Sequence, residues 1–329
     1  MIGQLFSQVP FVDRFAQNPE NAVDVIIPII HTNELWESNL LSIFREIPVK
    51  RLLISDGGCI DDSIEILQKF PRVTVFDHKK FTSLGYCLRI LMEEVQTERF
   101  IYLHSDVYLP AGWFATMWQS SEKYDWCESK HNNTFLLDIE ANYENYDRSL
   151  SGGQIGKKSA FAKVLPLIDD DFLYRNEDII FSELIKKMGG SYGRSEALLY
   201  HEIMHKKGSK WRRSITRLDV VVDKSPEEEL RELDTQARGL IKYLPPGKHS
   251  TSGALYSIQQ LVRLGKNLDQ FKDWVKTTPY ADQWLVEIES HFSQKQNASS
   301  SFWIELRGLA RTLYAVLRQT LVVFRVAFK

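Results

Sequence analysis

His104 and Asp106 are the first residues whose types and spacing could do chemistry. They follow a short apolar and aromatic run, residues 100–103, which is typical of a buried central strand. Because they lie two apart, an extended backbone would point both side chains the same way. A carboxylate and an imidazole placed so could hold a divalent cation against a diphosphate. The alternative is a strand that ends in ordinary polar turn residues.

Further titratable residues stand at the ends of predicted elements. Glu177 and Asp178 open a predicted helix, residues 179–188, and a carboxylate there could accept the proton of an attacking hydroxyl group. Acidic residues are also common in the first turn of a helix because they complement its dipole. His201 follows a short apolar strand and is either a further metal ligand or an ordinary histidine at a strand end.

Alternating strand-like and helix-like segments would position these residues. The predicted strands are residues 22–30, 51–55, 73–76 and 100–103, with helices at residues 33–46, 64–70 and 84–95 between them. This alternation predicts an α/β fold with a doubly wound, largely parallel sheet and right-handed crossovers. Ligands of such sheets bind at the carboxyl ends of the strands, where Asp56 and Asp106 are expected.

The composition bounds the class of protein and its partners. The 329 residues are 43% hydrophobic and 26% charged, which is ordinary for a soluble globular protein. A net charge of -2 argues against nucleic acid as a partner, and three scattered cysteines support neither disulfides nor a zinc site. The chain shows no secretory signal pattern and no apolar run of the ~18 residues that span a membrane, so we expect a cytoplasmic protein.

Several short motifs follow one another in a recognisable order. Val25-Ile26-Ile27-Pro28 lies near the end of the opening strand, and then come Ser55-Asp56-Gly57-Gly58, His104-Ser105-Asp106, Asn176-Glu177-Asp178 and finally His201. Together they resemble the landmarks of the family 2 glycosyltransferases of GT-A fold, over about residues 22–210. The resemblance implies a GT-A type, Rossmann-like mixed sheet. No single motif in it is specific.

The resemblance also implies a role for each motif. The triplet that ends at Asp106 would bind Mn²⁺ or Mg²⁺, with His201 and His104 as further ligands. Asp178 would be the catalytic base, with Glu177 as the second choice. The predicted nucleotide-sugar-binding residues are Pro28, Ile29, Asp56, Gly57, Arg89, His104, Ser105, Gly153, Lys206 and Trp211.

The substrates that follow from the resemblance are a nucleotide-sugar donor and a hydroxyl acceptor. We expect a UDP-sugar rather than a GDP- or dTDP-sugar, and a glycan or lipid-linked acceptor. Most members of the family invert the anomeric configuration. The basic loop at residues 206–213 could close over the diphosphate. Gly153 belongs to a glycine-rich stretch in which backbone could approach a ligand, or which could equally serve a sheet turn.

Two positions depart from the pattern of the family. Ser55 stands where the family often has a second carboxylate, which leaves Asp56 to contact the nucleotide. The metal triplet begins with His104 in place of an aspartate, as in one subgroup that the sequence resembles. Asp106 is therefore the stronger metal ligand, and His104 either ligates the metal or faces the ribose.

The same residues bear on three other functions. A sugar nucleotidyltransferase needs a glycine-rich basic loop after the first strand, and residues 31–36 contain neither glycine nor lysine. A dinucleotide-dependent oxidoreductase lacks its GxGxxG motif. The departures at Ser55 and His104 leave a further alternative, a non-catalytic protein that binds a nucleotide sugar or serves as a scaffold.

The chain is predicted to have four parts. They are an N-terminal arm (1–21), the glycosyltransferase domain (22–222), a helical appendage that ends in a polar linker (223–300) and a basic amphipathic helix (301–329). The last part has a stripe of arginines opposite a broad apolar surface. The stripe consists of Arg307, Arg311, Arg318 and Arg325. Such a helix fits the plane of an anionic membrane surface, which would make the protein peripheral on the inner face of the membrane. The alternative is a helix docked on its own domain or on a second subunit.

Overall fold

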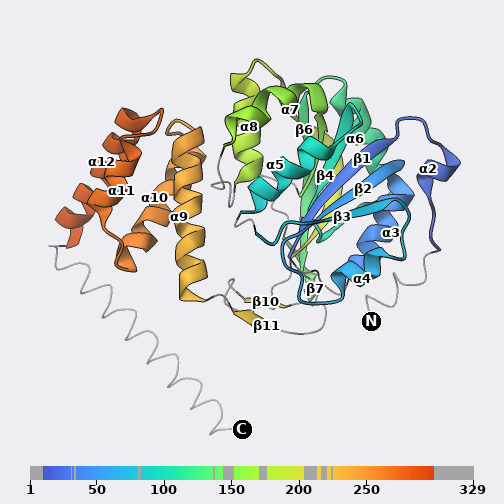
Figure 1. Cartoon of the computed structure of the whole chain (residues 1–329), viewed down its shortest axis with the longest axis horizontal. Helices are drawn as coiled ribbons and strands as arrows, with labels where there is room; N and C mark the ends of the chain where they lie inside the picture. Colours follow the sequence, from blue (N-terminus) through green and yellow to red (C-terminus); the bar gives the residue numbers. More distant parts are fainter. Residues whose placement is uncertain are drawn as a thin grey trace, which may run out of the picture.

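The computed structural model describes residues 10–30, 32, 35–80, 83–135, 138–143, 152–169, 176–203, 213–215, 221–223 and 225–299. Its main feature is a nine-stranded mixed sheet with helices on both faces, and a group of helices stands beside it (Figure 1). The strands follow the order β3-β2-β1-β4-β8-β6-β9-β5, and β7 pairs with β6.

The first half of the sheet is parallel, as the alternation of the sequence predicts. Its strands are β1 (Val23–Ile29), β2 (Val49–Asp56), β3 (Val73–Asp77) and β4 (Arg99–Leu103), and its helices are α3 (Trp36–Glu46), α4 (Ser63–Leu67) and α5 (Leu84–Glu94). Every residue of β1 is buried, because helices cover both faces of a central parallel strand. Pro28 lies beyond the stretch of β1 that pairs with β4, so its missing N–H breaks no bond on that side.

The second half of the sheet makes it mixed. Its strands are β5 (Val107–Tyr108), β6 (Trp126–Phe135), β7 (Asp138–Tyr143), β8 (Gly153–Lys157) and β9 (Tyr192–Ile203). β8 runs antiparallel to β4, β6 antiparallel to β8, β9 parallel to β6, and β5 antiparallel to β9. Its helices are α6 (Trp113–Ser121), α7 (Lys158–Val164) with a 3-10 turn (Leu165–Leu167), and α8 (Glu177–Lys187). This architecture confirms the predicted α/β mixed-sheet fold class.

The two faces of the sheet carry separate cores. Val25 and Ile27 pack on the face covered by α3, α4 and α6, and Ile26 packs on the opposite face with α5, α7 and α8. This is the alternation that a strand imposes on its side chains. A short N-terminal helix, α2 (Arg14–Gln17), lies next to α3. There Phe11 contacts Phe44 and Phe70, which fixes the described part of the predicted arm to the domain.

The helical appendage comprises α9 (Pro226–Tyr243), α10 (Lys248–Arg263), α11 (Leu268–Val275) and α12 (Ala281–Ser299). A small β-ribbon of β10 (Arg213–Ile215) and β11 (Val221–Asp223) precedes it. The start of α9 is a capping box, in which Ser225 Oγ accepts from the Glu228 N–H and Glu228 Oε2 accepts from the Ser225 N–H. Helix α12 continues to Ser299, over most of the polar segment for which the sequence predicts a linker.

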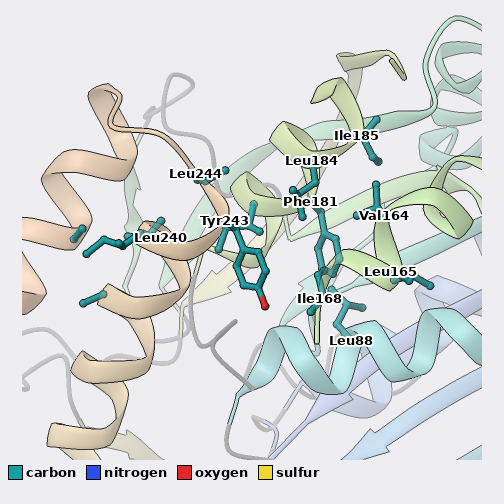
Figure 2. Close-up of a cluster of buried hydrophobic side chains, with 14 of the residues drawn as sticks. Leu88, Val164, Leu165, Ile168, Phe181, Leu184, Ile185, Leu240, Tyr243 and Leu244 are labelled. Carbon is teal, nitrogen blue, oxygen red and sulfur yellow. The ribbon is translucent and has the colours of Figure 1, made fainter. Parts of the chain in front are cut away.

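The appendage shares one hydrophobic core with the sheet. Tyr243 and Leu244, at the end of α9, belong to the same cluster as Phe181 and Leu184 of α8 (Figure 2). Trp284 of α12 is fully buried and donates to the Leu244 carbonyl oxygen at 2.8 Å. The helix that carries Glu177 and Asp178 is therefore packed between the sheet and the appendage. Among the described residues, no helix is both long and apolar enough to cross a membrane.

Candidate active site and metal centre

Three side chains predicted as metal ligands meet at the carboxyl end of β4. His104 follows β4, Asp106 precedes β5, and His201 lies on β9. The pairing of β5 with β9 sets Val107 opposite His201, and so brings a residue from far along the chain beside the triplet. One donor atom from each of the three side chains lies within 4.8 Å of the other two. This arrangement fits a divalent cation held by two imidazoles and one carboxylate.

The electrostatics of this cluster keep its ligands in the forms that bind metal. Burial, reinforced by the neighbouring His201, lowers the pKa of His104 to about 4. Burial alone would raise the pKa of Asp106, but the charge and the hydrogen bond of His201 outweigh it, so this pKa lies below its usual value. His201 Nε2 stands 3.2 Å from Asp106 Oδ1. At neutral pH His104 is therefore neutral and Asp106 is ionised, as coordination requires.

Gly152 closes one side of the cluster. Its carbonyl oxygen accepts the backbone N–H of His104 at 2.8 Å, and its φ of +59° lies in the left-handed region. A Cβ at this position would stand 2.9 Å from Val107 Cγ1 and 3.5 Å from His104 Nδ1. The predicted Gly153 lies instead on β8, where a Cβ would strike Leu199. Of the two glycines, Gly152 therefore faces the metal ligands and Gly153 serves the packing of the sheet.

Asp56 ends β2 at the same edge of the sheet, two strands from β4. Its Oδ1 accepts from the backbone N–H groups of Gly58 and Cys59, both at 2.8 Å, and its Oδ2 pairs with Lys79 Nζ at 3.3 Å. Burial would raise the pKa of Asp56, but these hydrogen bonds outweigh it and lower the pKa. Ser55 Oγ is buried and hydrogen-bonds His78 Nδ1 at 2.9 Å. Asp56 is thus an ionised acceptor with one oxygen committed to the turn.

The remaining predicted nucleotide-binding residues are placed as follows. Pro28 and Ile29 are part of buried β1, opposite Ser55 and Asp56 in the register, and the Gly57 N–H donates to the Ile29 carbonyl oxygen at 2.7 Å. The Ser105 carbonyl oxygen accepts from Asn39 Nδ2 at 3.1 Å.

Arg89 is not brought to the cluster by any contact between described residues. It pairs with Glu93 and lies over the Tyr86 ring, both on its own helix α5. Lys206 and Trp211 lie outside the described residues, as does the basic helix at residues 301–329.

The two candidate catalytic carboxylates occupy the first turn of α8. Asp178 Oδ1 accepts the backbone N–H of Ile179 at 2.8 Å. Burial, and next the nearby charge of Glu177, raise the pKa of Asp178 well above its ordinary value. The Tyr102 hydroxyl donates to Glu177 Oε1 at 3.0 Å, so β4 and α8 are tied together at the site. A carboxylate with a raised pKa, close to the metal ligands, is suited to proton transfer.

Sequence reasoning missed four side chains around the site. His131 of β6 lies with its ring 6.0 Å from that of His201, and burial lowers its pKa to about 4. Tyr102, Gln154 and Glu128 stand at matching register positions on β4, β8 and β6, on the face toward α8. No motif marks these residues, because strand pairing rather than sequence proximity brings them together.

Known proteins that resemble this chain are found only through their three-dimensional structures. No protein-family model matches the sequence, and no curated protein matches it. Among similar solved structures, S. aureus TarS 1-349 in complex with UDP-GlcNAc has 14% identity over 77% of this chain and 78% of its own, with a TM-score of 0.43. The Pyrobaculum calidifontis mannosyltransferase PcManGT in complex with GDP-Man and Mn²⁺ has 10% identity over 88% and 92%, with a TM-score of 0.46. The bifunctional IspDF from Campylobacter jejuni has 15% identity over 64% and 54%, with a TM-score of 0.36. We therefore derive function from this chain's own residues.

Proposed function

We propose that the protein is a metal-dependent glycosyltransferase that moves a sugar from a nucleotide-sugar donor to a hydroxyl group of a glycan or lipid-linked acceptor. The observation that carries this proposal is the group of His104, Asp106 and His201 beside the Glu177-Asp178 pair. A cation site and a carboxylate with a raised pKa are the two groups that such a transfer needs. The sequence resemblance to family 2 glycosyltransferases supports the same reaction.

The metal ligands suit the donor side of the reaction. A bound Mn²⁺ or Mg²⁺ would neutralise the negative charge that the leaving nucleoside diphosphate gains. Two imidazoles among three ligands favour Mn²⁺ over Mg²⁺, because imidazole suits transition metals better. Asp106 supplies the negative charge of the ligand set. His104 and His201 supply its nitrogen ligands, His104 as a neutral imidazole and His201 as one that is hydrogen-bonded to Asp106.

Asp178 serves the acceptor side as general base. It accepts the proton of the acceptor hydroxyl while that oxygen attacks the anomeric carbon, and the bond to the diphosphate breaks. Such a contribution is typically ~10²–10⁴-fold in rate. Single displacement with inversion is the course that the sequence resemblance implies.

The contacts of Asp56 favour a uracil base over guanine. Its Oδ1 already accepts two backbone N–H groups, which leaves Oδ2, next to Lys79 Nζ, to accept from a base. Uracil offers one N–H between two carbonyl oxygens, which matches one carboxylate oxygen beside one ammonium group. Guanine offers two neighbouring N–H donors, which require both carboxylate oxygens. The preference for UDP over dTDP stays a prediction from the sequence resemblance.

A donor screen by nucleotide release tests this proposal. We expect release from UDP-sugars in the presence of Mn²⁺, little release from GDP-sugars, and none after chelation of the metal. Acceptor screening would then use the best donor. Release from GDP-sugars at an equal rate would contradict the Asp56 argument. Tight UDP binding without turnover on any donor would favour the alternative of a non-catalytic binding or scaffold protein.

A sugar nucleotidyltransferase is the other enzymatic alternative. It would consume a nucleoside triphosphate and a sugar phosphate, and release pyrophosphate. Incubation with a nucleoside triphosphate and a sugar phosphate distinguishes it, since pyrophosphate release from that mixture, without transfer from UDP-sugars, would favour it. The absence of a glycine-rich basic loop at residues 31–36 argues against it.

A peripheral position on a membrane stays a prediction from the sequence of residues 301–329. We expect the full-length protein to cosediment with vesicles that contain anionic lipids, and far less with neutral vesicles. Replacement of Arg307, Arg311, Arg318 and Arg325 by glutamine should abolish this binding. Equal binding by the substituted and unsubstituted chains would contradict the role of the arginine stripe.

A further inference from the structure

Glu177 precedes the candidate base in the chain and lies near His104, one of the candidate metal ligands, and its side chain is only 7% exposed. Its Oε1 accepts from the Tyr102 hydroxyl at 3.0 Å and lies 4.0 Å from His104 Nε2. Its neighbour Asp178 is held differently, by the backbone N–H of Ile179. The two carboxylates at the start of α8 therefore face different partners.

The two nitrogens of the His104 ring also face different neighbours. Nε2 is directed to Glu177. Nδ1 lies on the side of Gly152, where an added Cβ would be 3.5 Å from both Nδ1 and His201 Cδ2. The backbone N–H of His104 is fixed by the Gly152 carbonyl oxygen at 2.8 Å. Nδ1 is therefore on the side of the ring near Gly152 and His201, and Nε2 is the nitrogen near Glu177.

We propose that Glu177 is a positioning residue for the metal site: it accepts the Nε2–H of His104, and so presents the unprotonated Nδ1 of that ring to the divalent cation. The inference rests on the proposed metal-dependent function. Histidines that bind metals usually donate their other N–H to a carboxylate or carbonyl group, which fixes the tautomer and the ring orientation. Tyr102 holds the carboxylate in place. A shift of about 1 Å brings His104 and Glu177 within hydrogen-bond distance.

This assignment separates the roles of two adjacent residues. Glu177 acts on the donor side through His104, and Asp178 acts on the acceptor as base. It also resolves the choice that the sequence leaves open for His104, because a carboxylate behind Nε2 indicates a metal ligand rather than a residue that faces the ribose.

The test measures Mn²⁺ binding by full-length protein, without turnover. Binding of Mn²⁺, alone and with saturating UDP, is followed by electron paramagnetic resonance for the wild type, Glu177→Gln and Asp178→Asn. In Glu177→Gln the side-chain oxygen can still accept from Tyr102, and the same oxygen faces His104 Nε2, but a neutral amide oxygen is a weaker acceptor than a carboxylate oxygen. We expect about 10–100-fold weaker Mn²⁺ binding in this variant. Asp178→Asn makes the same change from acid to amide one residue away and should bind Mn²⁺ like the wild type.

A spectroscopic measurement excludes a merely structural effect. In metal-free protein labelled with ¹⁵N-histidine, the neutral His104 ring should carry its proton on Nε2 in the wild type. In Glu177→Gln the Nδ1–H form should appear. Equal thermal unfolding midpoints show that the variant is folded.

The outcomes separate the inference from the function on which it rests. Wild-type Mn²⁺ affinity and an unchanged tautomer in Glu177→Gln would overturn the role of Glu177 while leaving metal-dependent transfer intact. Equal loss of affinity in Asp178→Asn would also overturn it, since the effect would then not depend on the contact between Glu177 and His104. A wild-type protein that neither binds Mn²⁺ with UDP nor turns over any donor would remove the proposed function, and the inference with it.

Discussion

An Asp106→Asn variant is expected to lose at least about 10³-fold in kcat/KM, because the cation would no longer be held against the developing charge of the diphosphate. Metal ions supply several kcal/mol of such stabilisation, and each 1.36 kcal/mol corresponds to a factor of ten in rate. Asp106 is the only carboxylate in the described group of metal ligands, and the pKa of Asp106 is lowered, so its charge is present at neutral pH. The measurement is the initial rate of nucleotide release as a function of Mn²⁺ concentration.

The control for Asp106→Asn is Asp169→Asn. Asp169 is an exposed carboxylate that pairs with Lys242, away from the site. The Asp169→Asn substitution should leave both the rate of nucleotide release and its dependence on Mn²⁺ unchanged. Asparagine at position 106 keeps the size of the side chain, so the fold should persist. An Asp106→Asn enzyme that saturates with Mn²⁺ at wild-type concentrations would rule out Asp106 as a ligand.

Asp178→Asn is expected to lower kcat by about 10²–10⁴-fold while leaving donor and metal binding nearly intact, because only proton transfer from the acceptor is removed. Glu183→Gln is a matched control on the same helix, since Glu183 is exposed and pairs with Lys186 one turn further along. Steady-state kinetics with donor and acceptor varied separately would show the loss in kcat. A wild-type kcat in Asp178→Asn would show that another group acts as the base.

The raised pKa of Asp178 adds a signature in pH and in stability. The base must be ionised, so kcat of the wild type should fall as the pH drops through this raised pKa, and the variant should lack that dependence. A carboxyl group whose pKa is higher in the folded than in the unfolded state costs stability once the pH rises above the unfolded value. At neutral pH, Asp178→Asn should therefore unfold at the same temperature as the wild type or higher. If Asp178→Asn unfolded at a lower temperature than the wild type, burial would not disfavour the ionised form of Asp178.

The parallel half of the fold could be predicted from the sequence because its information is local. β-branched runs such as residues 22–30 have the composition of buried central strands, and helix-like segments with period 3.6 lie between them. The start of α9 is also encoded locally, since Ser225, Pro226 and Glu228 are the residues that a helix N-terminus uses. Local patterns say less after Trp113, where β6 and β9 each take their partners from distant parts of the chain.

Some residues of the candidate site could likewise be predicted from the sequence, and others could not. Asp106, Asp178 and His201 could be singled out because motif order and element ends are properties of the sequence. The sequence pointed to Gly153, the first residue of β8, whereas Gly152, in the bend before that strand, is the glycine next to His104, and no short pattern separates the two. Nor could it find His131, which reaches His201 only through the pairing of β6 with β9.

Residue types, spacing and local periodicity thus determined the α/β class, the edge of the sheet that carries the chemistry, and the candidate ligands and base. Tertiary structure alone decided which of them meet. The pairing of Val107 with His201 assembles the candidate metal ligands, and the packing of α8 against β4 sets Glu177 beside His104. Burial then shifts the pKa values of His104 and Asp178. These effects depend on contacts between residues far apart in the sequence and on exclusion of water, and neither is encoded in any short segment of the chain.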